Sequence, residues 1–206
     1  MSQAPTPQAP AQPAIVWHDP TRADQFARWL SATAAQHGLQ IQSLRLASAD
    51  ASFRRYFRID APDGSRIIMD APPDKENSAP FVKVAALMQA AGVLAPQVLA
   101  WDEPLGFMLL PDLGAQTMMQ VINRDDPGAN LPLYLQAVDA LIAWQLSSRP
   151  DVLPPYDEAL LRRELTLFPD WYITQHKGVV LDEAMRKTLD NMFEQIISQN
   201  LSWPSV

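Results

Sequence analysis

Three arginines alternate with aromatic residues in the segment DASFRRYFRID, residues 50–60, of an otherwise acidic chain. Arginine presents a planar fork of N–H donors that fits the oxygens of phosphate or carboxylate groups. If the segment is a β-strand, Ser52, Arg54 and Arg58 project to one face and Arg55 projects to the other. The pattern predicts either a strand that binds phosphate or an exposed strand whose arginines are simply solvated.

The segment RRELTLFPDWYI, residues 162–173, places aromatic rings beside carboxylates. An aromatic plane suits the apolar face of a sugar ring, and carboxylates suit its hydroxyl groups. Glu164, Asp170 and Trp171 are therefore candidates for binding a sugar. The alternative is an amphipathic helix in which Trp171 packs in the core.

Two further features could carry binding chemistry. The segment FMLLPDLG, residues 107–114, is an apolar strand that runs into an exposed Pro-Asp turn, and a buried strand that merely ends in a turn explains it equally well. Glu76 directly precedes a predicted helix and is a candidate for orienting a cation. The alternative is a solvated charge pair with its neighbour Lys75.

Composition excludes several classes of function. With 16 Lys+Arg against 23 Asp+Glu, the formal net charge of −7 argues against general nucleic-acid binding. Cysteine is absent, so disulfides, thiolate catalysis and cysteine-ligated zinc are excluded, and the three histidines lie far apart in sequence. We find no signal-peptide pattern and no apolar run long enough to cross a bilayer, so we expect a cytoplasmic protein without membrane contact.

Hydrophobic periodicity predicts the elements that position these residues. Residues 1–14 are rich in Pro, Ala and Gln and are expected to form a disordered tail. Residues 15–113 are expected to form one lobe: a helix, three antiparallel strands with a turn at Asp63-Gly64, a second helix and two more strands. Residues 114–206 have helical periodicity. The predicted fold class is therefore α+β, with a five-stranded antiparallel sheet and a packed helix followed by a partial all-helical lobe.

Four ordered stretches, DASFRRYFRI, IIMDAPP, GVLAPQVLAWDEPLGFMLLPDLG and RRELTLFPDWY, resemble the aminoglycoside phosphotransferase family. They are most similar to its branch of cell-wall kinases that phosphorylate amino sugars at the anomeric position. The resemblance implies a protein-kinase-like fold, the cofactors ATP and Mg²⁺, and γ-phosphoryl transfer to an amino sugar in peptidoglycan recycling. It also implies three sets of site residues: Ser52, Arg54, Arg55 and Arg58 for phosphate, the backbone of the hinge at Leu110, Asp112 and Leu113 for adenine, and Glu164, Asp170 and Trp171 for the acceptor.

The sequence departs from the wider kinase pattern at the phosphate site. It has no G-x-G-x-x-G stretch in the cationic segment, and Met69 and Asp70 occupy the third strand where protein kinases carry a phosphate-pairing lysine. One hypothesis is that an arginine of the preceding strand replaces this lysine. Glu76 would orient a cation, as the αC glutamate does in kinases.

No stretch of the form H-x-D-x-x-x-x-N occurs in the 206 residues. NRDDPGAN, with Asp125 and Asn130, imitates its spacing, but its composition and its place just after the hinge indicate a loop. We therefore expect a chain truncated before the catalytic loop, with no catalytic residue or Mg²⁺ ligand and no activity alone. The alternatives are a nucleotide-binding or protein-interaction remnant, or a helical regulator that contacts acidic proteins. Exposed helical faces would favour self-association.

Overall fold

The computed structural model describes residues 15–49 and 53–203, and it divides the chain into one compact unit up to Leu146 and a second from Ser147. The predicted tail, residues 1–14, and the candidate Ser52 lie outside the described residues. The first unit contains a five-stranded antiparallel sheet with helices, which confirms the predicted α+β class. The boundary expected after residue 113 falls inside this first unit.

The sheet has the strand order β1-β2-β3-β5-β4, and every neighbouring pair is antiparallel. A regular register joins β2 to β3, with Phe57 opposite Ile68 and Arg58 opposite Ile67. The Asp63-Gly64 turn connects these two strands as the sequence predicted, and Gly64 has the positive φ of 130° that glycine tolerates. The strands are β1 (Gln40–Ala49), β2 (Arg55–Ala61), β3 (Gly64–Asp70), β4 (Ala100–Asp102) and β5 (Phe107–Pro111).

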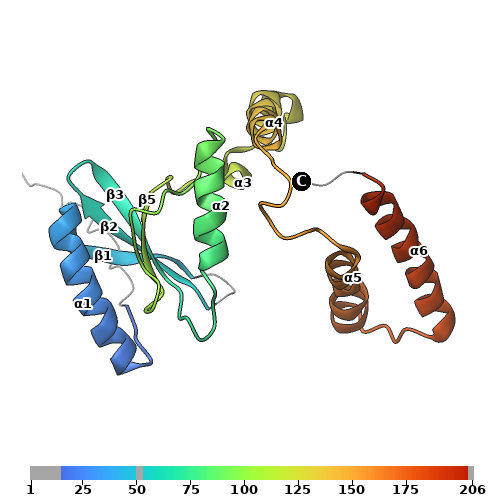
Figure 1. Cartoon of the computed structure of the whole chain (residues 1–206), viewed down its shortest axis with the longest axis horizontal. Helices are drawn as coiled ribbons and strands as arrows, with labels where there is room; N and C mark the ends of the chain where they lie inside the picture. The colour runs from blue at the N-terminus through green and yellow to red at the C-terminus, as the bar shows by residue number, and fades with distance from the viewer. Residues whose placement is uncertain (1–14, 50–52, 204–206) are drawn as a thin grey trace, which may run out of the picture. The chain divides into compact units, whose positions relative to one another are not determined.

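Helix α1 (Pro20–His37) covers one face of the sheet (Figure 1). It begins where the Asp19 side chain accepts a hydrogen bond from the backbone N–H of Thr21, and it ends at Gly38 in the left-handed conformation. Its apolar side packs on alternate strand residues, which are fully buried. This core cluster includes Phe26 and Leu30 of α1 with Phe57, Ile59, Ile68, Phe107 and Leu109 of the strands.

Helix α2 (Ala79–Ala90) lies on the opposite face (Figure 1). It contributes Phe81 and Val82, which pack against Met69, Met108 and Leu110 from the strands. Because strand side chains alternate between faces, the residues on either side of Met69 belong to the α1 face. The sheet is therefore covered on both faces, and each face has its own apolar cluster.

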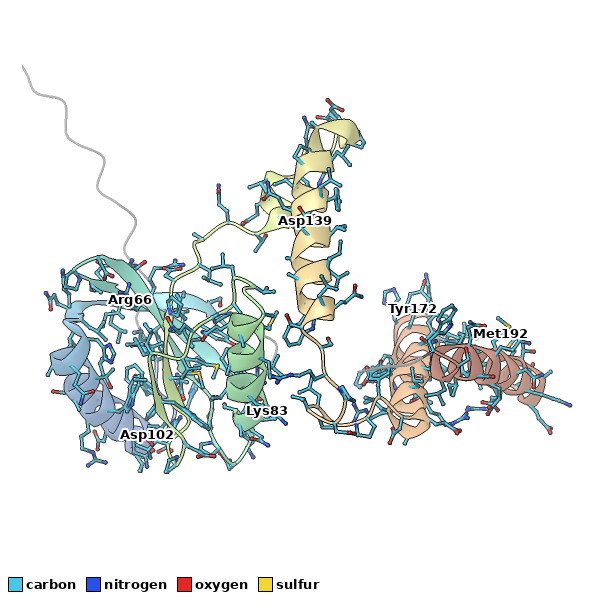
Figure 2. The ribbon with its side chains drawn as sticks, turned by 45° about the horizontal axis from the view of Figure 1, so that its top comes forward. Arg66, Lys83, Asp102, Asp139, Tyr172 and Met192 are labelled. Atoms are coloured by element: carbon cyan, nitrogen blue, oxygen red, sulfur yellow. The ribbon has the colours of Figure 1, made fainter. Side chains whose placement is uncertain are left out.

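The remainder of the first unit is helical and begins with α3 (Met118–Val121) and the 3-10 helix η1 (Pro127–Asn130). In the stretch NRDDPGAN, residues 123–126 form a loop, as predicted, and the last four residues form η1. The Asn130 side chain accepts from the backbone N–H of Asn123 and donates to its carbonyl, at 2.7 Å each. Helix α4 (Leu131–Leu146) follows; it has no buried residue, and its one charged side chain is Asp139 (Figure 2).

The second unit consists of α5 (Glu158–Leu167), the π-helix η2 (Phe168–His176) and α6 (Glu183–Leu201). Its buried residues are few: Leu161, Pro169, Phe193 and Ile197. Arg162 links α5 to α6 by donating to Glu194 at 2.6 Å. Across the part of the chain that the structure describes, no helix is long and apolar enough to span a bilayer.

Candidate functional site

The pleat of the sheet separates the three arginines of the cationic segment. Arg54 lies just before β2 and Arg58 lies within it, and both belong to the α2 face, whereas Arg55 projects to the α1 face. Each arginine binds a different carboxylate. The sequence predicted this division between faces and offered Glu76 for orienting a cation, but it did not predict Asp70 and Asp112 as partners of Arg55 and Arg58.

Arg54 is held by Glu76, the residue that sequence reasoning considered for orienting a cation. Its Nε and Nη2 donate to one Glu76 oxygen at 3.1 and 3.0 Å. The hydrogen bond that Arg54 donates to Glu76 raises the pKa of Arg54 above its ordinary value. Glu76 is itself fixed, because its backbone N–H donates to the Pro72 carbonyl at 2.9 Å. Lys75 contacts Asp74 at 3.4 Å, so the pair Lys75–Glu76 considered as an alternative is not the one formed.

Arg55 belongs to a buried cluster on the α1 face. Asp70, whose side chain is fully buried, accepts from Nη2 of Arg55 and from Nη2 of Arg22, each at 2.6 Å. The guanidinium of Arg22 lies 3.9 Å from the ring centroid of Phe107, and that of Arg55 lies 4.0 Å from the ring of Trp17. These contacts bind α1 to β2 and β3, and they leave Asp70 turned away from the α2 face.

Arg58 binds the residue that follows strand β5. Its Nε and Nη2 donate to the two oxygens of Asp112, the second at 3.1 Å. Asp112 also accepts from the Ser65 hydroxyl at 2.6 Å and from the backbone N–H of Gly114 at 2.9 Å. The hydrogen bond from Arg58, followed by the other donors, lowers the pKa of Asp112 well below its ordinary value. The hinge candidate is thus joined to two strands through its side chain.

Leu110 and Leu113, the other two hinge candidates, differ in exposure. Leu110 is the fourth residue of β5 and is buried against Met69 and Met108. The Leu113 side chain is 54% exposed, and its peptide groups make no hydrogen bond within the described part of the chain. A free backbone N–H and C=O at an exposed position suit the donor and acceptor edge of a base.

The three acceptor candidates lie together in the second unit, at the junction of α5 and η2. Glu164 contacts Arg163 at 3.0 Å, and both side chains are exposed. Trp171 is 67% exposed, so the alternative in which it packs in the core is wrong. Asp170 lies in the first turn of the π-helix and is also exposed.

Sequence reasoning missed several residues that shape these sites. Arg22 gave no signal, because its partner Asp70 is 48 residues away. Ser65 had a weak signal, its position directly after the hairpin turn. Tyr172 of η2 stacks between Phe168 and His176, with ring centroids 5.5 and 5.6 Å apart, and their spacing of four residues was the available signal. Among the described residues, no group of three or more His, Cys, Asp or Glu is placed to hold a metal ion.

A family model described as phosphotransferase enzyme family matches residues 43–202. The chain belongs to this family. The match includes the whole sheet except the first strand residues of β1, and it confirms the resemblance carried by the four sequence stretches. The carboxylate-bound arginines of the first unit therefore belong to a phosphotransferase-family chain.

The family relatives include bacterial proteins named N-acetylmuramate/N-acetylglucosamine kinase. The chain is 49% identical over 160 residues to the one from Pseudomonas aeruginosa, covering 78% of this chain and 46% of that protein. It is 43% identical over 164 residues to the one from Pseudomonas putida, covering 80% and 48%, and 39% identical over 165 residues to the one from Neisseria meningitidis, covering 79% and 49%. The chain thus spans about half the length of the curated relatives it matches.

Proposed function

We propose that the first unit is the ATP-binding lobe of a kinase lineage that transfers a γ-phosphoryl group to an amino sugar. Family membership and the names of the relatives support the reaction class and the acceptor class. The observation that carries the proposal within the structure is the Arg54–Glu76 pair, with its nitrogen–oxygen distance of 3.0 Å. It places an oriented cation on the α2 face of a lobe whose third strand has no lysine.

Arg54 would hold the β- and γ-phosphates of ATP. Charge spreads over the phosphoryl oxygens during transfer, and a fixed guanidinium stabilises that charge. The Glu76 carboxylate holds the guanidinium at two nitrogens, so the cation is already oriented before phosphate binds. Arg55 and Arg58 were also candidates for phosphate, but Arg55 lies on the opposite, α1 face, and Arg58 bonds both Asp112 and the Gly114 carbonyl. We assign these two arginines to positioning.

The backbone of the hinge, at Leu110, Asp112 and Leu113, would hold the adenine edge. The exposed Leu113 supports this assignment, because its peptide groups make no hydrogen bond among the residues that the structure describes. In the second unit, Glu164, Asp170 and Trp171 would bind the acceptor, with the exposed indole ring stacking on the apolar face of the sugar. Mg²⁺ would neutralise phosphate charge when bound with ATP, and we assign no residue of this chain to it.

We further propose that the 206-residue polypeptide transfers no phosphate by itself, because it contains no H-x-D-x-x-x-x-N stretch. Peptidoglycan recycling in the cytoplasm is the proposed setting, since the relatives' printed names contain N-acetylmuramate, a cell-wall sugar. The second candidate is a nucleotide-binding module without catalysis, and the same missing stretch favours it. Sugar-phosphate formation by the purified polypeptide, above a mock preparation, would contradict both statements about activity.

Titration with ATP tests the proposed nucleotide site directly. We expect ATP to raise the melting temperature of the chain, since a ligand selective for the folded state stabilises it. Arg54→Ala should raise the dissociation constant of ATP at least about tenfold, because a hydrogen bond to a charged group contributes about 1.5–3 kcal/mol. Arg66→Ala is the matched control: Arg66 contacts Asp63 at the β2–β3 turn and projects to the α1 face. Equal affinity of ATP for the parent and Arg54→Ala would refute the role of Arg54.

A further inference from the structure

A second charged network on the α2 face holds the hinge rather than the phosphate site. Its members come from three places: Arg58 on β2, Ser65 on β3, and the segment from Asp112 to Gly114 after β5. Arg58 and Asp112 are 54 residues apart in sequence, and Ser65 and Asp112 are 47 apart. The hinge is therefore fixed by side chains from strands that are not its neighbours along the chain.

The network binds the backbone of Gly114 at both of its polar groups. The Gly114 N–H donates to Asp112 at 2.9 Å, and the Gly114 carbonyl accepts from Nη2 of Arg58 at 3.5 Å. Gly114 has a φ of 104°, a conformation that favours glycine. These bonds fix the direction in which the chain turns after Asp112. They leave the peptide groups of Leu113, between the two bonded residues, without a hydrogen bond in the described part of the chain.

Asp112 is well satisfied as an acceptor. Its side chain is 9% exposed, and it accepts from two nitrogens of Arg58, from the Ser65 hydroxyl and from a backbone N–H. A nearly buried carboxylate with charge-assisted hydrogen bonds on both oxygens has little freedom to rotate. Loss of the arginine would leave this carboxylate with weaker neutral donors and more solvent. The hinge would then sample more than one backbone direction.

We propose that Arg58 and Ser65 are positioning residues for the nucleobase, acting through Asp112 on the backbone of Leu113. This inference rests on the proposed nucleotide site. A base edge is recognised by a donor and an acceptor at a fixed separation, so a hinge held in one direction binds it without an ordering cost. The two arginines of the cationic segment thus have different roles: Arg54 binds the phosphates, and Arg58 positions the backbone that binds the base.

Three probes distinguish these roles: ATP, adenosine and inorganic tripolyphosphate, each titrated calorimetrically into the full chain. For Arg58→Ala we expect the dissociation constants of ATP and adenosine to rise about tenfold, and that of tripolyphosphate to stay within about twofold. Arg58→Lys keeps the charge but not the two-nitrogen contact, so it should recover part of the loss. Arg54→Ala should show the opposite pattern, with tripolyphosphate weakened and adenosine unchanged. Arg66→Ala should match the parent for all three probes.

Each outcome decides the inference. Equal weakening of ATP and tripolyphosphate by Arg58→Ala would make Arg58 a phosphate ligand and overturn the positioning role. If Arg58→Ala bound all three probes with the affinities of the parent, the positioning role would also be overturned, but the proposed nucleotide site would not. If the parent binds neither ATP nor adenosine, the proposed function fails first and the inference fails with it.

The variant Ser65→Ala tests the same network if Arg58→Ala fails to fold. It removes one hydroxyl donor to Asp112 and leaves the ion pair in place. We expect a smaller rise, about threefold, in the dissociation constant of adenosine, and a smaller fall in melting temperature than in Arg58→Ala. Hydrogen exchange at the Gly114 amide supplies a readout without nucleotide: its protection should fall in both Arg58→Ala and Ser65→Ala. Unchanged protection in both variants would show that the network does not hold the hinge.

Discussion

Replacing Asp70 with asparagine tests how the first unit holds α1 on its sheet. The buried Asp70 carboxylate accepts from Arg22 and Arg55, so two guanidinium groups share one negative charge. Asparagine keeps the shape of the side chain but is neutral, and its NH₂ group is a donor that faces other donors. One guanidinium therefore loses its acceptor, and both positive charges remain near the core without compensation.

The magnitude follows from the burial of the three groups. Removing one partner of a buried ion pair costs about 3–5 kcal/mol, because the remaining charge stays desolvated. The side chains of Arg22 and Arg55 are 12% and 29% exposed, so water can relieve part of that penalty. We expect Asp70→Asn to lower the free energy of unfolding by about 3 kcal/mol. For a unit of this size the melting temperature should fall by roughly 6–12 °C.

Urea unfolding of the full chain at pH 7, followed by circular dichroism, measures this loss. Asp60→Asn is the matched control, because Asp60 contacts Arg45 at 2.9 Å but its side chain is 43% exposed. An exposed pair contributes at most about 1 kcal/mol, so this variant should unfold close to the parent. If Asp70→Asn were no less stable than Asp60→Asn, the buried cluster would not be what holds α1, and the reasoning would be refuted.

Three other predictions concern acid stability, association and the exposed indole. The pKa of Asp112 is lowered in the folded state, so the stability that its charged form contributes is present above about pH 4 and is lost as the pH falls through the folded-state pKa. Asp112→Asn should therefore lose less stability on acidification than the parent does. An equal loss of stability between the two proteins would contradict this. Helix α4 exposes several apolar side chains, among them Leu141 at 53%, so we expect the parent to self-associate. In sedimentation velocity, Leu141→Glu should raise the fraction of monomer. A parent that sediments as a monomer at high concentration would contradict this. Trp171→Ala should change stability by less than about 0.5 kcal/mol, because the indole is 67% exposed; a larger loss in thermal melts would place Trp171 in a packed core.

The sequence predicted the parts of the fold that depend on local patterns. The Asp63-Gly64 turn and the alternating residues before it are enough to predict the β2–β3 hairpin and to place Arg54 and Arg58 on one face. The helix α1 follows in the same way from its apolar spacing and from Gly38 at its end. Both predictions depend only on residues that are close together in the sequence.

The carboxylate partners could not be predicted, because they depend on how distant elements pack. Arg58 reaches Asp112 across 54 residues, and Arg22 reaches Asp70 across 48. Sequence reasoning assigned a role to the backbone at Asp112, and nothing in the local pattern showed that its side chain would bind Arg58. The π-helix that begins at Phe168 is another case, since its wider winding continues directly from the α-helix α5 and has no distinct composition.

Two glycine turns in the first unit impose opposite limits on protein engineering. A side chain added at Gly106 would place its Cβ atom 1.9 Å from the carbonyl oxygen of Ala71, whose N–H donates to the Gly106 carbonyl at 2.9 Å. The turn between β4 and β5 therefore has a fixed length and no room for a reporter peptide. At Gly64 no atom lies within 4 Å of such a Cβ, and the neighbouring Asp63 side chain is 72% exposed. An affinity tag or fluorophore belongs at this second turn, away from both faces of the sheet.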